Sequence, residues 1–157
     1  MTKYDSLFRM DGKTAFVAGG AGAIGAAIAE ALAEYGAKIA IADRLEQTAI
    51  ETAARLDPSH KLSMGISVDI TDEDSVEACF TAVKEHFGSI DILINAAGIH
   101  IEQPAHELTL EAWDKVLNVN LRGAFLLSQA AAKRMIEQSR GGSQVHITSV
   151  RSFLGIR

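Results

Sequence analysis

The sequence has little cysteine, since Cys79 is the single thiol among 157 residues. One thiol excludes a disulfide framework or a thiol metal cluster within the chain, and it fits a reducing, cytoplasmic setting. Cys79 falls in a helical pattern, so we expect it to be a small core residue. The five histidines show no metal-ligand spacing, so we predict no metal site. His146, inside an apolar strand pattern, is expected to be a core residue.

The sequence also lacks long apolar runs and basic blocks. No run approaches the roughly 20 apolar residues of a membrane span. The formal net charge is −5, and no basic block is present to neutralise a run of phosphates. We therefore expect neither a membrane nor a nucleic acid as partner. With 48% hydrophobic and 22% charged residues, the chain is long enough for a sizeable core, and we predict a single domain over residues 1–157.

Apolar strand patterns alternate with helical patterns along the chain. The expected strands are residues 14–18, 37–43, 61–68, 91–98 and 143–149. The expected helices run from the first turn to Gly36, to about Leu56, from a capping-box pattern at 71–74 to Gly88, and from about Thr109 to Gln138. Strands separated by helices pair in parallel through right-handed crossovers. We therefore predict an α/β fold, a Rossmann-type doubly wound parallel sheet of five strands with helices on both faces.

The first strand-to-helix turn, AGGAGAIG at 18–25, is rich in glycine. Glycines permit a tight turn and let backbone N–H groups approach a pyrophosphate, whose charge the helix N-terminus stabilises. Such a turn also serves simple helix-to-strand packing, so alone it is weak support for function. Asp43 ends the second strand eighteen residues after Gly25, close to the spacing expected for a carboxylate that binds adenosine ribose. Together these features predict a dinucleotide site.

At these positions the sequence resembles the short-chain dehydrogenase/reductase family, whose pattern T-G-x-x-x-G-x-G falls on residues 18–25. Ala18 replaces the family's threonine, and Ala23 replaces its middle glycine. Further matches are VDIT at 68–71, NAAG at 95–98, NVNLRG at 118–123 and ITS at 147–149. The resemblance spans essentially the whole chain. It implies an oxidoreductase that interconverts a secondary alcohol and a ketone by hydride transfer to or from a nicotinamide cofactor.

The resemblance assigns roles to residues in each motif. It implies cofactor binding by Gly19, Ala21, Ala23, Ile24, Gly25, Asp43, Asp69, Ile70, Asn95, Ala96 and Gly98. Asn120 matches the helix asparagine that holds a proton-relaying water, and Ser149 matches the catalytic serine. Each polar residue also has a structural interpretation. The asparagines can satisfy buried backbone groups, Asp69 can cap a turn, and a serine at a strand end is often a loop hydroxyl.

Asp43 favours NAD as the cofactor over NADP, because the 2′-phosphate of NADP would bring a like charge against the carboxylate. Arg44 beside it can soften this preference by pairing with the phosphate. The resemblance also implies a homo-oligomer, since the apolar face of AFLLSQAAAKRMI at 124–136 packs in a subunit interface in this family. Trp113, on the same long helical pattern, is expected to be a packing residue.

Ser149 cannot supply the proton that carbonyl reduction requires, because a neutral hydroxyl is too weak an acid near pH 7. The family uses a tyrosine about thirteen residues beyond the serine and a lysine four further on, near positions 162 and 166. Tyr4 and Tyr35 precede the first strand and end the first helix, far from the cofactor edge of the sheet. We therefore expect a C-terminally incomplete member of this family that is inactive alone.

Two other function classes stay open at this point. A glycine-rich turn and an acidic strand end also suit an adenosylmethionine-dependent methyltransferase, although NAAG and the serine at 149 count against it. A non-catalytic nucleotide-binding module would need no tyrosine. The opening LFRMDGKTAFVAGG looks like family members that act on sugar acids, polyols or related secondary alcohols. Arg151 is a candidate contact for a substrate carboxylate.

Overall fold

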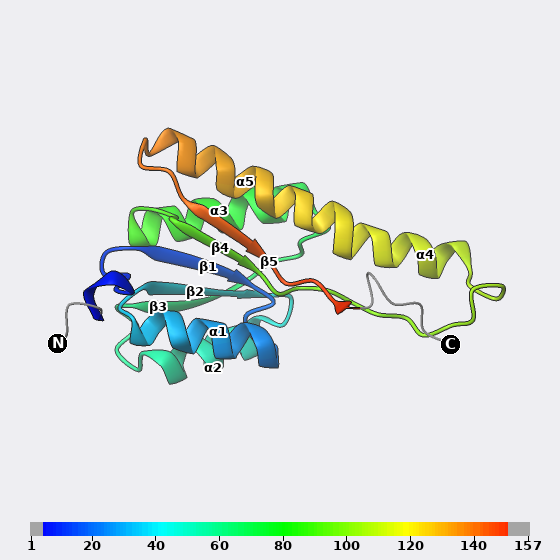
Figure 1. The fold of residues 1–157 in the computed structure, drawn as a ribbon, viewed down its shortest axis with the longest axis horizontal. Helices are drawn as coiled ribbons and strands as arrows, with labels where there is room; N and C mark the ends of the chain where they lie inside the picture. The colour runs from blue at the N-terminus through cyan, green and yellow to red at the C-terminus, as the bar shows by residue number, and fades with distance from the viewer. Residues whose placement is uncertain (1–4, 151–157) are drawn as a thin grey trace.

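The computed structural model describes residues 5–150, which form a five-stranded parallel sheet between two layers of helices (Figure 1). The strand order is β3-β2-β1-β4-β5. The strands are β1 (Thr14–Ala18), β2 (Lys38–Asp43), β3 (Ser63–Ser67), β4 (Ile92–Asn95) and β5 (Ser143–His146). The order of addition reverses between β1 and β4, and ligands bind such sheets at the carboxyl ends of these strands. The predicted Rossmann-type α/β fold is confirmed.

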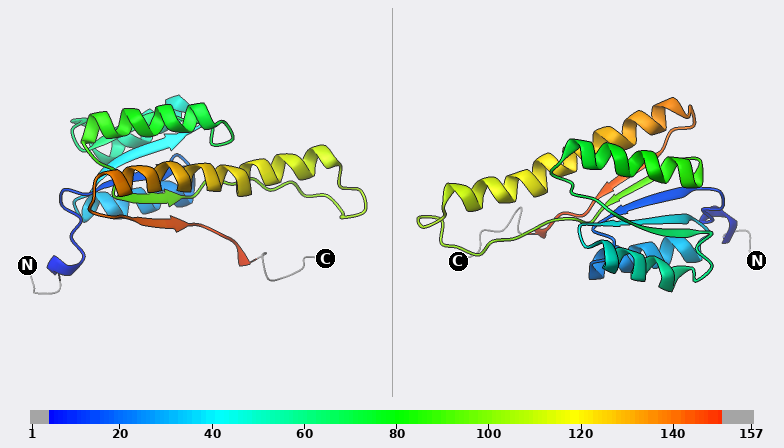
Figure 2. Two further views of the ribbon diagram at one scale, coloured as in Figure 1. Left: turned by 90° about the horizontal axis from the view of Figure 1, so that it is seen from above. Right: turned by 180° about the vertical axis from the view of Figure 1, so that it is seen from behind.

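Helices cover both faces of the sheet (Figure 2). The helices are α1 (Ala23–Glu34), α2 (Glu46–Leu56), α3 (Glu73–Phe87), α4 (Leu110–Leu117) and α5 (Ala124–Glu137). One apolar cluster joins α1 and α2 to one face, and a second joins α3 and α5 to the other. All helices of the described residues are too short or too polar to span a lipid bilayer.

Successive residues of β1 enter the two clusters alternately, as the pleat of a strand requires. Ala15 and Val17 pack toward α1 and α2, whereas Phe16 packs toward α3 and stacks on Phe80 with ring centroids 4.1 Å apart. Cys79 of α3 is buried as expected. Burial raises the pKa of its thiol to about 12, so the thiolate that would react or bind metal is not formed near neutral pH.

The prediction of one continuous helix over 109–138 is wrong in one respect, because the helix is interrupted. Between α4 and α5 the segment Asn118–Gly123 is π-helical. Such wider turns are uncommon and occur frequently at functional sites. Gly123 lies against Ile70, where an added Cβ would be 2.8 Å from the Ile70 side chain. The π-helical segment thus brings the helix close to the residues that follow β3.

Both ends of α3 use local capping, but the N-terminal cap differs from the expected one. Asp72, not Thr71, is the N-cap residue, and its carboxylate accepts a hydrogen bond from the Asp74 N–H at 3.0 Å. Aspartate caps helices as well as threonine does, and Thr71 instead donates its hydroxyl to Asp69 at 2.7 Å. Gly88 ends the helix with φ of 88°, as predicted.

The edge strand β5 is shorter and more exposed than its apolar pattern predicts. It ends at His146 instead of residue 149, and all four of its residues are exposed. His146 is therefore not a core residue, because an edge strand lacks a second neighbouring strand. Trp113 of α4 is likewise not packed in the core, with 52% of its surface exposed.

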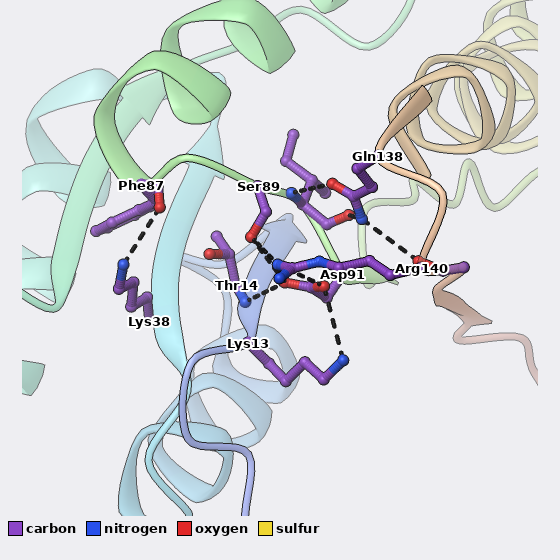
Figure 3. Close-up of polar contacts among 10 residues, drawn as sticks. Lys13, Thr14, Lys38, Phe87, Ser89, Asp91, Gln138 and Arg140 are labelled. Atoms are coloured by element: carbon purple, nitrogen blue, oxygen red, sulfur yellow. Dashed lines mark hydrogen bonds and ion pairs between the residues drawn. The ribbon is translucent and has the colours of Figure 1, made fainter. Parts of the chain in front are cut away.

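At the amino edge of the sheet, a buried carboxylate joins distant segments (Figure 3). Asp91, just before β4, accepts hydrogen bonds from the Thr14 N–H and the Ser89 hydroxyl, both at 2.9 Å. Arg140, from the turn between α5 and β5, forms an ion pair with it at 3.0 Å. These contacts fix the starts of β1 and β4 side by side, and therefore also the relative position of their carboxyl ends.

Candidate functional site

A cleft of about 410 Å³ opens at the carboxyl ends of the central strands. Its walls come from the turn after β1, the ends of β2 and β3, the loop after β4, and one side of α4 and the π-helical segment. The lining residues are Gly19, Gly22, Asp43, Arg44, Val68, Asp69, Ile70, Thr71, Ala96, Ala97, Gly98, Ile99, Lys115, Asn118 and Val119. Six of the predicted cofactor residues are among them: Gly19, Asp43, Asp69, Ile70, Ala96 and Gly98.

The glycine-rich turn is shaped by two close backbone approaches. Gly19 has φ of +70°, and a Cβ there would lie 2.7 Å from the Ala97 nitrogen. A Cβ on Gly25 would collide with the carbonyl oxygen of Gly19. The N-cap residue of α1 is Gly22, which provides no side-chain hydrogen bond to the first helical turn. The N-terminus of α1 is thus open to an anion at the cleft.

Asp43 joins the end of β2 to this turn. One carboxylate oxygen accepts a hydrogen bond from the Ala21 N–H at 3.2 Å, and the other accepts from the Leu45 N–H at 3.2 Å. Both backbone groups fix the carboxylate at the cleft wall. Arg44 also lines the cleft and places a positive charge beside Asp43.

Asp69 lies after β3 and is held by Thr71. Its carboxylate accepts hydrogen bonds from the Thr71 N–H at 2.9 Å and from the hydroxyl at 2.7 Å. These bonds lower the pKa of Asp69 below its usual value, and the positive charge of Arg44 lowers it further. Asp69 is therefore an ionised acceptor in the cleft and also caps a turn, as its structural interpretation proposed. Arg122 of the π-helical segment donates to the Thr71 carbonyl at 3.1 Å.

Asn95 and Asn120 hold the loop after β4 from two sides. The side-chain oxygen of Asn95 accepts a hydrogen bond from the Ala97 N–H at 3.1 Å. Asn120 accepts from the Ile99 N–H at 2.8 Å and donates to the Ile99 carbonyl at 2.9 Å. Neither side chain lines the cleft, so both shape it through the backbone that does.

The remaining predicted residues lie around the cleft. Ala21, Ala23, Ile24 and Gly25 belong to the turn and the start of α1, where Ile24 is exposed and Gly25 is buried. Ser149 is exposed and follows β5, the neighbour of β4. The candidate substrate contact at position 151 lies outside the described residues. No group of three or more potential metal ligands occurs within residues 5–150.

Sequence patterns missed the wall that α4 contributes. Lys115 and Asn118 line the cleft from one helix face, three residues apart. No motif contains Lys115, and Asn118 lies in NVNLRG without an assigned role, although this spacing of polar residues on one helix face was a detectable signal. Val119 and Ile99 were missed because apolar lining residues look like core residues in a sequence.

A glycine-rich turn, an open helix N-terminus and an acidic strand end around one cleft define a Rossmann-type protein of the nucleotide-binding class. The model of the family described as short chain dehydrogenase matches residues 13–157, and the chain belongs to this family.

Two curated relatives act on polyols by name. The chain is 46% identical over 145 residues to a D-threitol dehydrogenase of Mycolicibacterium smegmatis, covering 92% of the chain and 55% of that protein. It is 39% identical over 141 residues to a sorbitol dehydrogenase of Cereibacter sphaeroides, covering 90% and 54%. The chain thus spans about half the length of these relatives.

A solved structure shares the fold closely. A gluconate 5-dehydrogenase from Burkholderia cenocepacia, in complex with NADP and tartrate, superposes with a TM-score of 0.89 at 34% identity. The match covers 98% of this chain and 60% of that one. The fold described above is therefore that of the first part of a short-chain dehydrogenase.

Proposed function

We propose that this chain is the cofactor-binding portion of an NAD-dependent dehydrogenase that interconverts a secondary alcohol and a ketone. The observation that carries the proposal is the cleft itself. It combines the close backbone approach at Gly19, the open N-terminus of α1 and the fixed carboxylate of Asp43. These are the features that a dinucleotide requires for its pyrophosphate and its adenosine ribose.

The residues present fit a nicotinamide dinucleotide. A Cβ at Gly19 would lie 2.7 Å from the Ala97 nitrogen, and one at Gly25 would collide with the Gly19 carbonyl oxygen, so the glycines permit the tight turn that places the α1 N-terminus at the cleft. Asp43 would accept hydrogen bonds from the ribose hydroxyls, and Asp69 would lie beside the adenine. Once bound, the nicotinamide supplies the hydride acceptor or donor. The loop of residues 96–99 would support the nicotinamide half.

Ser149 would orient the substrate oxygen, and Asn120 would hold a water that relays protons. The Asn120 amide already binds the Ile99 backbone, so a water would use the remaining lone pair of its oxygen. Proton transfer to the substrate needs an acid with a pKa near the working pH, which we assign to a tyrosine and lysine in the second half of the complete protein.

A polyol or sugar acid is the substrate class we propose. The names of the relatives support this proposal. Two relatives are a threitol and a sorbitol dehydrogenase, and a protein of similar structure is a gluconate dehydrogenase. Such substrates carry several hydroxyls and are small. A cytoplasmic protein is also proposed, since a reducing compartment suits the single buried thiol.

The function is tested by titrating the chain separately with NADH and with S-adenosylmethionine while following thermal stability. We expect stabilisation by NADH alone, because a ligand that binds the folded state raises its stability. Stabilisation only by S-adenosylmethionine would instead support a methyltransferase. Turnover of polyols with NAD should appear when the chain is continued through the second half of the protein, and binding without turnover there would indicate a non-catalytic module.

A further inference from the structure

His146, the last residue of β5, has a defined place beside the cleft that the proposed function does not yet use. Its Nδ1 is 3.3 Å from the side-chain nitrogen of Asn95, and its Nε2 is 3.0 Å from the hydroxyl oxygen of Ser128 on α5. The imidazole thus bridges the end of β4 and the helix that packs over it.

Every hydrogen bond in this bridge has a fixed direction. The Asn95 oxygen accepts from the Ala97 N–H, so the Asn95 nitrogen must be the group that faces His146. An amide nitrogen is a donor only, so Nδ1 of His146 must accept and Nε2 must carry the proton. Nε2 then donates to Ser128, whose hydroxyl donates to the Ala124 carbonyl at 2.8 Å.

The bridge holds the cleft wall through the backbone. Residues 96–99 line the cleft, and they are fixed at Ala97 by Asn95 and at Ile99 by Asn120. Asn120 lies in the π-helical segment, and Ala124 is the first residue of α5. Both points that fix the loop therefore depend on the same stretch of helix, and His146 contributes its imidazole to this connection.

We infer that neutral His146 is a positioning residue for the cofactor loop, and that its protonation loosens this loop and weakens dinucleotide binding. An imidazolium carries N–H groups at both nitrogens, so Nδ1–H would face the NH₂ of Asn95, donor against donor. Asn95 would have to turn away, and its oxygen would leave the Ala97 N–H. This inference rests on the proposed dinucleotide site.

The charged side chains of the elements around His146 do not hold a protonated imidazole in its present position. β4 carries no titratable side chain, and His146 is the only one in β5. The charged side chains of α5 are Lys133, Arg134 and Glu137, and they pair with Glu77 and Lys84 of α3 on the other side of the helix. No carboxylate of β4, β5 or α5 is thus placed to hold an imidazolium in the present geometry.

The first test measures NADH affinity by fluorescence from about pH 8 to about pH 5.5, the range in which histidine changes charge. We expect the dissociation constant of the unmodified chain to rise about tenfold, the equivalent of one lost hydrogen bond between neutral groups. His146→Gln should bind more weakly at pH 8 and show no such rise. His86→Gln, an exposed histidine of α3, is the matched control and should keep the full rise. The same rise in His146→Gln would overturn the inference.

A second measurement does not need the cofactor. In nuclear magnetic resonance spectra, the Ala97 backbone amide and the His146 imidazole should shift with one common midpoint as the pH falls. The Ala97 shift should be absent in His146→Gln. If NADH fails to bind while this coupling is seen, the proposed function is wrong and the positioning role stands. An Ala97 amide that ignores the His146 titration would refute the positioning role.

Discussion

Asp43 is the residue on which cofactor choice depends. Its carboxylate is fixed by the Ala21 and Leu45 N–H groups, so it cannot easily turn away from a ligand in the cleft. A 2′-phosphate held about 4 Å away would be opposed by on the order of 1 to 4 kcal/mol at the dielectric of such a site. We therefore expect clear preference for NADH over NADPH, although Arg44 lies beside the carboxylate.

Replacing Asp43 by serine should raise the affinity for NADPH relative to NADH by about tenfold or more, since the opposing charge is removed. Fluorescence titration with both nucleotides measures this ratio. Asp74→Asn, which removes an exposed negative charge on α3, is the control and should leave the ratio unchanged. Equal affinities of the unmodified chain for both nucleotides would show that Asp43 does not face the ribose.

Asp57 makes the stability of the fold depend on pH in the acid range. It accepts hydrogen bonds from Ser59, Lys61 and Leu62 in the turn between α2 and β3. The hydrogen bonds from Ser59 and Leu62 are the main cause that lowers its pKa from 3.8 to about 2. Because the folded pKa is depressed, this stabilisation is complete above the unfolded value and disappears as the pH falls toward the folded value.

We therefore expect Asp57→Asn to be less stable than the unmodified chain at pH 7 and to lose less stability between about pH 4 and about pH 2. Urea unfolding at a series of pH values measures both effects. Glu46→Gln, an exposed carboxylate at the start of α2, should retain the acid dependence. Parallel curves for Asp57→Asn and the unmodified chain would contradict the role given to Asp57.

At this scale the sequence predicts the motif residues but not their partners. Gly19, Asp43 and Asp69 stand at strand ends that any parallel sheet brings to one edge, so their place in the cleft follows from the pattern. Asn120 binds Ile99 because the π-helical segment reaches the loop after β4, and His146 meets Asn95 because β4 and β5 pair in that register. The periodicity of a local sequence pattern carries no information about such contacts between distant residues.

At the scale of elements, the π-helical segment is the feature with the clearest consequence. Gly123 allows it to lie against Ile70, a cleft residue, and Asn120 within it holds the cofactor loop. An alanine in place of a helical glycine normally stabilises by up to about 1 kcal/mol. Here the added Cβ would lie 2.8 Å from the Ile70 side chain.

Gly123→Ala should therefore destabilise the chain by about 1 to 3 kcal/mol, in the opposite sense to its helix propensity. It should also weaken NADH binding, because the loop held by Asn120 would move with the helix. Gln129→Ala, on the exposed face of α5, should change stability by less than about 0.5 kcal/mol. Chemical denaturation distinguishes the two, and a stabilised Gly123→Ala would show that this contact is easily relieved.

The interruption of the long helix could not be read from its sequence. Apolar residues recur with helical spacing from Leu110 to Met135, and a π-turn adds one residue without breaking that spacing visibly. The N-cap of α3 was misplaced for a related reason, since Thr71 and Asp72 are both good caps. Only the competing hydrogen bond from Thr71 to Asp69 decides between them.

At the scale of the whole molecule, one helix surface remains uncovered. Leu110, Trp113, Leu117, Leu121 and Phe125 form an exposed apolar row along α4, the π-helical segment and the start of α5. Such a row marks an interface in soluble proteins. We propose that it mediates the homo-oligomer. The row extends toward α4 from the 124–136 face that the family resemblance implied, where Phe125 is exposed but Leu126 and Leu127 are buried in the core.

Phe125→Asp should shift the assembly toward monomer, because a charge in an apolar interface is not compensated. Light scattering coupled to size-exclusion chromatography measures the mass directly. Leu62→Asp changes a similarly exposed apolar residue outside the row and should leave the mass unchanged. A monomeric unmodified chain, or an unaffected mass in Phe125→Asp, would exclude this surface as the interface.

The buried Asp91 cluster also sets the order in which the site can form. The hydrogen bond from Thr14 to Asp91 joins residues 77 positions apart, and the Gly19 turn meets Ala97 across a similar span. Closing so long a loop is entropically costly and slow, and parallel pairing of β1 with β4 depends on it. During synthesis, β1, α1 and β2 can assemble early, while the cleft is incomplete until the chain has emerged past Asn120, because residues within 115–119 line it and Asn120 holds its loop. A ribosome-bound chain shortened before that point should therefore resist proteolysis in its first strands and still fail to retain a nucleotide.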